Sequence, residues 1–241
     1  CLGLLFYKKK ECLLALKKYR EALKIRRRLA ECNSNTFLSD IAETLNNLAV
    51  LYTAIPKYDL ALKEYEKALN IYRGLARKSP GPFLPYVALS LNNLATLYSE
   101  IKEYEPALEK FRESLVIRRE LAAINPKPFL RYVAQTHNNL AILYWKTQEF
   151  NSALLEYKEA LKTFRGLVAS EPKAFLPDMA QTLLNLSIFY HQSVSDKEKA
   201  VAYAQEARSI LVPLCKQAPH LRGELDRVEE VLKRNNGRLK A

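Results

Sequence analysis

The chain has 241 residues, of which 49% are hydrophobic and only 6 are glycine, and its formal net charge is +12. The longest apolar runs fall far short of the ~20 residues that a membrane-spanning helix needs, and no signal-peptide pattern is present, so we expect a soluble, cytoplasmic protein. The cysteines show neither Cys-x-x-Cys spacing nor histidine pairing, so the sequence offers no metal site, and we expect reduced thiols and no cofactor: Cys1, Cys12, Cys32 and Cys215.

An internal repeat governs most of the sequence. Four alanines stand 46 residues apart, and each opens an Ala-Leu-x-x-aromatic-x-x-Ala/Ser-Leu stretch: Ala15, Ala61, Ala107 and Ala153. A fixed period of this length is typical of a solenoid, in which stacked units form an extended binding surface rather than one catalytic pocket.

The first repeat, roughly residues 1–34, is expected to be truncated. Cys1-Leu2-Gly3 aligns with Asn47-Leu48-Ala49, which lies inside a helix of the next repeat. This alignment indicates a fragment excised from a longer protein. The alternative is a lipoprotein processed at Cys1.

The second repeat, roughly 35–80, serves as the template for a helical hairpin. Leu45, Leu48, Ala49 and Tyr52 recur at helical spacing, and a turn at Pro56-Lys57 separates them from a second set formed by Ala61, Tyr65, Ala68 and Leu69. The small Ala49 and Ala61 should let the two backbones approach closely while the tyrosines fill the space beside them.

The same residues return in the repeats at 81–126 and 127–172. Helix-breaking prolines close each unit, and a phenylalanine-leucine pair follows each of them, which we expect to plug the joint between repeats. The prolines are Pro80, Pro126 and Pro172, and the phenylalanines that follow are Phe83, Phe129 and Phe175.

The fifth repeat, roughly 173–218, is irregular, as terminal repeats often are. Ala200 follows Ala153 after 47 residues rather than 46, which places one extra residue near Ser193-Val194-Ser195. The segment 219–241 should then hold an amphipathic capping helix over Leu221 to Leu232, followed by a polar tail that begins at Arg234.

The residues that recur in the second, third and fourth repeats resemble the tetratricopeptide repeat (TPR) pattern W-x-x-L-G-x-x-Y, A-x-x-x-F, A. Leucine or His137 stands in place of the tryptophan, and alanine stands in place of the glycine. The long repeats carrying Leu-Asn-Asn-Leu-Ala are most similar to the kinesin light chain subclass. The resemblance implies an all-α fold: a right-handed superhelix of about five helix hairpins, the first truncated, with a C-terminal capping helix.

Asparagines recur at two adjacent positions of the first helices: Asn46, Asn92 and Asn138, then Asn47, Asn93, Asn139 and Asn185. A side-chain amide offers both a donor and acceptors, so a row of amides can bind the backbone of an extended peptide. The family resemblance implies that the second of these positions contacts peptide in a concave groove. The alternative is that the amides bond neighbouring helices and fix repeat packing.

Other positions that the resemblance assigns to the groove vary between repeats, as specificity requires. Trp145 is of a residue type that often anchors an interface, although it could equally pack against the adjacent repeat. Lys146 and His191 could meet a carboxylate of the ligand, and Glu100 is a further candidate.

Three functions follow as hypotheses. The first is a scaffold that binds a peptide segment of a partner protein, and the positive charge would suit an acidic one. The second is a regulatory or sensor arm of a larger effector that contacts its own catalytic domain. The third is an electrostatic binder of nucleic acid or membrane, which is disfavoured because basic clusters such as Arg26-Arg27-Arg28 lie among glutamates without an aromatic-basic motif.

The sequence does not predict an enzyme. His137 occupies the tryptophan position of its repeat and is interpreted as a packed core residue, and no nucleophile or carboxylate stands at a meaningful spacing from it. A column of arginines late in the second helices is interpreted as structural, since arginine favours a helix C-terminus: Arg27, Arg73, Arg119 and Arg165.

Overall fold

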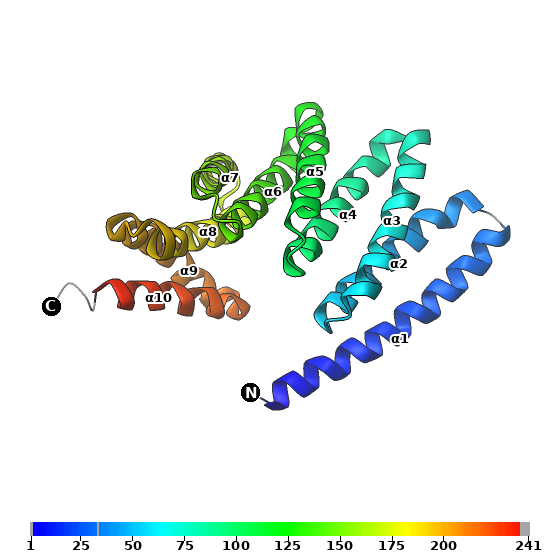
Figure 1. Ribbon diagram of the computed structural model, residues 1–241, viewed down its shortest axis with the longest axis horizontal. Helices are drawn as coiled ribbons and strands as arrows, with labels where there is room; N and C mark the ends of the chain where they lie inside the picture. The colour runs from blue at the N-terminus through cyan, green and yellow to red at the C-terminus, as the bar shows by residue number, and fades with distance from the viewer. Residues whose placement is uncertain (1, 33, 237–241) are drawn as a thin grey trace. The chain divides into compact units, whose positions relative to one another are not determined.

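A computed structural model describes residues 2–32 and 34–236 of the chain (Figure 1), and in them every regular element is helical. The prediction of an all-α repeat fold is confirmed. The elements are, in order, α1 (Leu2–Cys32), α2 (Ser34–Ala54), α3 (Tyr58–Lys78), α4 (Pro80–Glu100), α5 (Tyr104–Ile124), α6 (Pro126–Lys146), α7 (Phe150–Ser170), α8 (Pro172–Phe189), the π-helical turn η1 (Tyr190–Val194), α9 (Lys197–Gln217), the 3₁₀ turn η2 (Pro219–Leu221) and α10 (Arg222–Asn236).

The helices form two compact units, and the division falls inside α5, between Ile117 and Arg118. The first unit contains α1 to α4 and the first part of α5, and the second contains the remainder of α5 and α6 to α10. None of the helices in the described ranges is long and apolar enough to span a membrane.

Each hairpin is held together by small residues at its centre. In the first unit Ala49 on α2 and Ala61 on α3 are fully buried, and Tyr52 and Tyr65 are buried beside them, as the sequence predicted. Two alanines at a helix crossing let the backbones approach, and large rings fill the volume above and below. These residues belong to one apolar core of the first unit, which extends from Leu16 on α1 to Leu97 on α4.

The turns inside the hairpins use a residue in the left-handed region. Lys102 (φ 67°), Gln148 (φ 63°) and Ser195 (φ 56°) each follow the first helix of a hairpin. None of the three is a glycine, so each turn contains a backbone conformation that L-residues adopt at a cost of roughly 1 kcal/mol. The extra residue predicted in the fifth repeat is absorbed just before Ser195, where α8 widens into the π-helical turn η1.

Each proline at a joint between repeats is the first residue of the following helix. Pro80, Pro126 and Pro172 are the first residues of α4, α6 and α8, and a single residue separates each from the preceding helix. At that position the missing N–H would have had no helical partner, so proline fits without loss. The phenylalanines that we expected to plug the joints are only half-buried, and Phe175 borders an open cavity of about 730 Å³ beside Leu130 and Leu167.

The first repeat consists of one continuous helix. Lys10 stands where the template has the turn residue Pro56, yet α1 continues from Leu2 to Cys32 without interruption. The stretch around Lys10 contains neither glycine nor proline, and lysine and glutamate are good helix formers, so no residue there stops the helix. The lipoprotein alternative concerns Cys1, which lies outside the described residues.

The capping helix is confirmed as α10, which packs on α9 and α8 through four buried side chains: Leu225, Val228, Val231 and Leu232. The prediction of a polar tail from Arg234 onward was wrong for the residues that the structure describes. Asn235 belongs to α10, is 1% exposed, and donates a 2.7 Å hydrogen bond to the carbonyl oxygen of Val231. A helix interior accepts a buried asparagine when its amide is satisfied in this way. Gly237, which the predicted tail also contains, lies outside the described residues.

Candidate functional site

The first helices of the hairpins present a polar stripe that we call the first-helix surface. Its members follow the spacing i, i+4, i+7 and i+11, which places them on one face of each helix. In the first unit they are half-buried or exposed: Glu43, Asn47, Val50 and Ala54 on α2, and Leu89, Asn93, Thr96 and Glu100 on α4.

The second unit carries the equivalent positions on α6, α8 and η1, where most of these side chains are half-buried or buried. They are Gln135, Asn139, Ile142 and Lys146, followed by Gln181, Asn185, Ile188 and, in η1, Gln192. Asn185 is buried, whereas Lys146 and Gln192 are exposed. Of the predicted residues, Asn47, Asn93 and Glu100 in the first unit and Asn139, Lys146 and Asn185 in the second occupy these positions, whereas Asn46, Asn92, Asn138, Trp145 and His191 do not.

The asparagines fall into two groups. Asn46 is buried and donates from Nδ2 to Ser90 Oγ at 2.8 Å, while its own Oδ1 is without a partner. Asn185 donates to Asn138 Oδ1 at 3.2 Å and accepts from Gln181 at 3.0 Å. These amides connect neighbouring first helices, which is the structural alternative that the sequence left open.

Asn47 and Asn93 behave differently. Both side chains are half-buried, and among the described residues neither forms a hydrogen bond. Asn92 and Asn139 are also half-buried but do interact with other residues of the chain. The first unit therefore has two amides, on adjacent first helices, that the fold itself does not use.

Trp145 packs against the adjacent repeat. Its Nε1–H donates to Ser193 Oγ at 2.6 Å, and its ring meets Phe189 edge to face with centroids 5.7 Å apart. The indole donor is already satisfied and the ring is half-buried, so the packing role that we considered for Trp145 is present in the structure. Lys146, the next residue, is exposed at the end of α6 and has an interaction partner within the chain.

His191 borders a small cavity of about 240 Å³ between η1 and α10. Its Nδ1 lies 3.2 Å from Asn235 Oδ1, and two arginines of α10, Arg227 and Arg234, also line the cavity. Sequence reasoning missed these arginines. Their spacing of two helical turns on the capping helix was the available signal, because it places both on one face of α10.

Together with burial, the carboxylate of Glu100 raises the pKa of a buried tyrosine in the same unit. Burial raises the pKa of Tyr65 to about 12, a hydrogen bond from Thr53 opposes the shift, and the nearby carboxylate of Glu100 adds to it. Thr53 and Glu100 both belong to first helices, so the end of the first-helix surface lies close to the buried hydroxyl of Tyr65.

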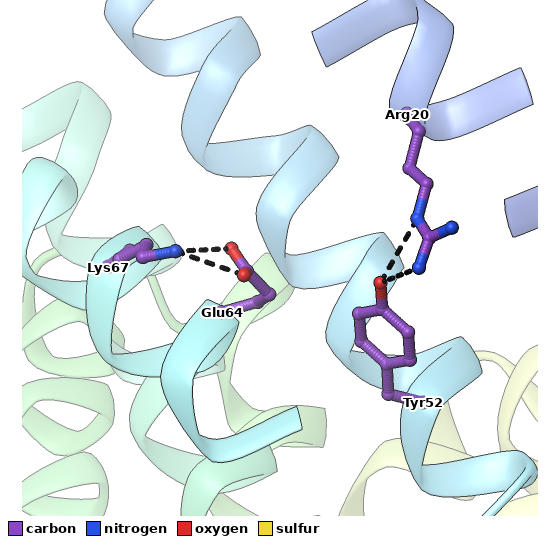
Figure 2. Close-up of polar contacts among 4 residues, drawn as sticks. All are labelled: Arg20, Tyr52, Glu64 and Lys67. Carbon is purple, nitrogen blue, oxygen red and sulfur yellow. Dashed lines mark hydrogen bonds and ion pairs between the residues drawn. The ribbon is translucent and has the colours of Figure 1, made fainter. Parts of the chain in front are cut away.

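The joint between α1 and α2 contains a further polar contact, shown in Figure 2. Arg20 on α1 donates from Nε and Nη2 to the hydroxyl oxygen of Tyr52 at 3.2 and 2.8 Å, and on the neighbouring α3 Lys67 pairs with Glu64 at 3.0 Å. An open cavity of about 630 Å³ lies beside Arg20, and Leu13, Tyr52 and Ile55 contribute its apolar lining. This contact fixes α1 against α2.

His137 is buried, as the sequence predicted, and lies between two charged groups. Arg119 donates from Nη2 toward Nε2 at 3.1 Å, and Nδ1 lies 2.5 Å from Glu156 Oε2. Because a guanidinium can only donate, Nε2 is the acceptor and Nδ1–H is the donor to Glu156. The arrangement satisfies every polar atom of the imidazole but contains no nucleophile.

The arginine column takes part in contacts between helices. Arg73 pairs with Glu113 at 2.5 Å and Arg165 pairs with Glu206 at 3.0 Å. Both pairs connect one second helix to the next, so this column contributes to repeat packing. Within the described ranges no three residues of the types His, Cys, Asp and Glu are grouped so that they could hold a metal ion.

The family assignment follows from these repeats. Family models described as "Tetratricopeptide repeat" match residues 1–74, 40–120 and 133–168, which together make up more than half of the chain. The chain therefore belongs to the tetratricopeptide repeat family, whose members are generally non-catalytic, and its fold is that of a protein-interaction scaffold.

Solved structures share this fold. BtubC (BKLC) from P. vanneervenii is 21% identical, with 93% of this chain and 89% of that chain covered and a TM-score of 0.66. The apo form of RapI is 20% identical over 98% and 81%, with a TM-score of 0.68. The nearly identical TPR-like repeats of a Podosopora anserina kinesin light chain are 18% identical over 86% and 96%, with a TM-score of 0.52. No curated protein matches the sequence.

Proposed function

We propose that this chain is a scaffold whose first-helix surface binds an extended segment of a partner protein. The observation that carries the proposal is the state of Asn47 and Asn93, whose amides are half-buried, lie on adjacent first helices, and form no hydrogen bond among the described residues. An amide held in this way can donate to a peptide carbonyl and accept from a peptide N–H whatever the peptide sequence is.

Specificity comes from the positions that differ between repeats. In the first unit the exposed Glu100 would select a positive charge on a bound segment, and in the second unit the exposed Lys146 would select a negative one. His191, Arg227, Glu230 and Arg234 line a cavity at the end of the second unit. Since Arg234 pairs with Glu230 at 2.5 Å, Arg227 is the residue that would bind a carboxylate of the segment. Together with the net charge of +12, this cavity favours an acidic segment. Trp145 would stabilise this end of the second unit through its packing on Phe189 and its hydrogen bond to Ser193.

The experiment is an affinity capture from lysate of the source cell at physiological salt, which compares the wild-type chain with the Asn47→Ala, Asn93→Ala double variant. Retained proteins are identified by mass spectrometry, and the affinity of the leading partner segment is then measured with purified components. We expect the double variant to bind more weakly by roughly 1 to 3 kcal/mol, because the peptide groups that the amides pair are left unsatisfied.

The matched control is Asn70→Ala, which removes the same amide from an exposed position on α3 and should leave binding unchanged. The melting temperature of the double variant should stay close to that of the wild type, since neither side chain bonds within the fold. Unchanged binding by the double variant would overturn the proposal. Recovery of nucleic acid equally by all variants, with affinity falling steeply as salt rises, would instead favour the electrostatic hypothesis.

A further inference from the structure

The first unit contains an open cavity between α1, the end of α2 and the turn that leads into α3. Its volume is about 630 Å³. Pockets that hold small ligands measure roughly 300 to 1,000 Å³ and are mostly apolar, with a few polar groups that fix the ligand. Here Leu13, Leu16 and Ile55 form apolar walls. None of the residues that line the cavity belongs to the first-helix surface, so the two features are separate.

Cationic side chains dominate the polar part of the lining. Lys17, Arg20 and Lys24 follow one face of α1, and Lys57 lies in the turn before α3. Within the described ranges no ion pair joins any of the four to an acidic residue. This part of the cavity therefore attracts anions.

Acidic residues near the cavity do not cancel this charge. Glu21 is the acidic residue of the lining, but its side chain is 50% exposed and lies 3.5 Å from Lys18. The exposed Glu11 and Asp59 lie nearby in the sequence and do not line the cavity. One carboxylate therefore stands against four cationic groups in the lining.

Tyr52 supplies a buried donor to the same cavity. Its side chain is 6% exposed, and its hydroxyl oxygen accepts hydrogen bonds from Arg20 Nε and Nη2 at 3.2 and 2.8 Å (Figure 2). A guanidinium has no acceptor, so the hydroxyl hydrogen has no partner among the described residues, and neither have the two hydrogens on Nη1 of Arg20. A buried hydroxyl donor is rarely left unpaired, which indicates an acceptor that the chain itself does not supply.

The next joint of the first unit shows which group the repeat places beside this tyrosine. One repeat later Tyr98 takes the position of Tyr52, and Glu66 takes that of Arg20. Burial raises the pKa of Tyr98, and the nearby carboxylate of Glu66 adds to the shift. That joint therefore has its own carboxylate close to the tyrosine, whereas the first joint has a guanidinium that would hold an external one.

We propose that this cavity binds a small amphiphilic anion, namely a carboxylate carried on an apolar chain. The two carboxylate oxygens accept hydrogen bonds from the hydroxyl group of Tyr52 and from Nη1 of Arg20, and the lysines around them add charge attraction. The apolar chain lies along Leu13, Leu16 and Ile55. This site is independent of the peptide surface proposed above.

The test uses the whole chain and sodium decanoate as the probe, with binding measured by isothermal titration calorimetry. Sodium acetate provides the same head group without the chain, and decyltrimethylammonium provides the same chain with the opposite charge. Decanoate should bind at least about tenfold more tightly than either of them, because only decanoate satisfies both the cationic groups and the apolar walls.

Three variants of the lining should each weaken the binding of decanoate by at least about fivefold, the loss expected for about one hydrogen bond or apolar contact. Arg20→Gln removes the guanidinium, and Tyr52→Phe removes the hydroxyl donor while it keeps the ring. Leu13→Gln removes an apolar wall at a position that is already 54% exposed, so it leaves the fold intact.

Each variant has a matched control that should bind decanoate like the wild type. Arg77→Gln removes an exposed arginine at the far end of α3, and Tyr98→Phe removes the corresponding hydroxyl at the next joint. Leu155→Gln changes a 60% exposed leucine in the second unit. The Asn47→Ala, Asn93→Ala protein should also bind decanoate unchanged, which separates this site from the first-helix surface.

Lack of decanoate binding, or equal weakening by the variants of the lining and by their controls, would overturn the proposal. Binding of acetate as tight as that of decanoate would also do so, since the apolar walls would then contribute nothing. A further contrary result is sedimentation with phosphatidylserine vesicles that Arg20→Gln abolishes while decanoate does not bind, because a membrane surface would then be the partner. Circular dichroism of each variant confirms that a loss of binding is not a loss of helix.

Discussion

Arg118 on α5 donates to Thr136 Oγ1 on α6 at 2.6 Å, and it also donates to the carbonyl oxygen of Tyr132 at 2.9 Å. Two repeats earlier Arg26 on α1 makes the same kind of contact with Thr44 on α2. In each unit an arginine on the second helix of one repeat thus donates hydrogen bonds to the first helix of the following repeat. Its acceptors there are a threonine hydroxyl and a main-chain carbonyl oxygen.

The joint between α3 and α4 is built differently. Tyr72 stands where the arginine would be and stacks on Tyr86, with ring centroids 5.2 Å apart. Ser90 has the position of the threonine, and its hydroxyl accepts a hydrogen bond from Asn46 instead of from an arginine. Tyr72 brings no guanidinium to this joint, and Asn46 supplies the donor to the serine hydroxyl instead.

The first prediction concerns Arg118. It is 4% exposed, and burial lowers its pKa to about 10, so its guanidinium is a buried charge held by neutral acceptors. Arg118→Ala should lower the free energy of unfolding by roughly 2 to 3 kcal/mol, because it removes two hydrogen bonds and leaves a cavity. Urea denaturation checks this value. Arg165→Ala, which breaks an exposed ion pair with Glu206, should cost less than about 1 kcal/mol, and equal costs would contradict the argument.

The second prediction separates two adjacent asparagines. Asn46→Ala should lower the free energy of unfolding by about 1 to 2 kcal/mol, because it leaves the buried Ser90 hydroxyl without its donor. Asn47→Ala should change stability by less than about 0.5 kcal/mol, as expected for a side chain outside such a contact. Chemical denaturation of both variants gives the comparison, and a larger loss for Asn47→Ala would show that its amide is structural.

The third prediction concerns His137, whose position is leucine in three other repeats: Leu45, Leu91 and Leu183. His137→Leu should stay within about 1 kcal/mol of the wild type, since an apolar side chain of similar volume can replace a buried polar network and Glu156 is close enough to the surface to be solvated. His137→Ala should cost roughly 2 to 4 kcal/mol because it also opens a cavity. Thermal unfolding of the two variants side by side decides between these outcomes, and equal losses would assign the stability to the Arg119 and Glu156 contacts.

The fourth prediction is a loss of stability at high pH. The pKa of Tyr65 is about 12 in the folded chain and about 10 when unfolded, so the folded state favours the protonated hydroxyl. This contribution is fully present below pH 10 and is lost as the pH rises toward 12, by about 2 kcal/mol. Burial also raises the pKa of Tyr72 and Tyr157, which adds in the same direction.

Ultraviolet titration of the tyrosinates, recorded together with circular dichroism, measures this effect. The last tyrosines should ionise in the same pH range in which helix is lost. Tyr65→Phe should lose less stability between pH 9 and pH 11 than the wild type. Ionisation of all tyrosines near pH 10 without any loss of helix would contradict the prediction.

The fifth prediction uses the left-handed turn residues. Lys102→Gly and Gln148→Gly should each raise the free energy of unfolding by up to about 1 kcal/mol, because glycine adopts a positive φ without the steric cost that other residues meet. Lys78→Gly, in the last turn of α3, should destabilise by a similar amount and serves as the control for the flexibility of glycine itself. Equal destabilisation by all three substitutions would show that the turns are not strained.

The repeat period, the paired helices and their packed faces could be predicted from the sequence, because helical spacing and the alternation of small and large residues are local properties. Ala49 against Ala61, with Tyr52 and Tyr65 beside them, is such a case. The capping helix was predictable for the same reason. The continuity of α1 through Lys10 was not, since the template implied a turn that no residue of that stretch enforces.

The contacts of the candidate binding residues were decided only by the tertiary structure. Asn46 and Asn47 are neighbours of the same type in the same pattern, yet one bonds Ser90 and the other forms no bond within the described chain. Nothing in the sequence indicated that Ser193 would accept a hydrogen bond from the indole N–H of Trp145. Each of these contacts joins residues more than forty positions apart, and its geometry depends on how two helices cross. The sequence by itself therefore determined which helices form and which faces they bury, while the tertiary structure decided which polar groups those crossings satisfy and which remain for a partner.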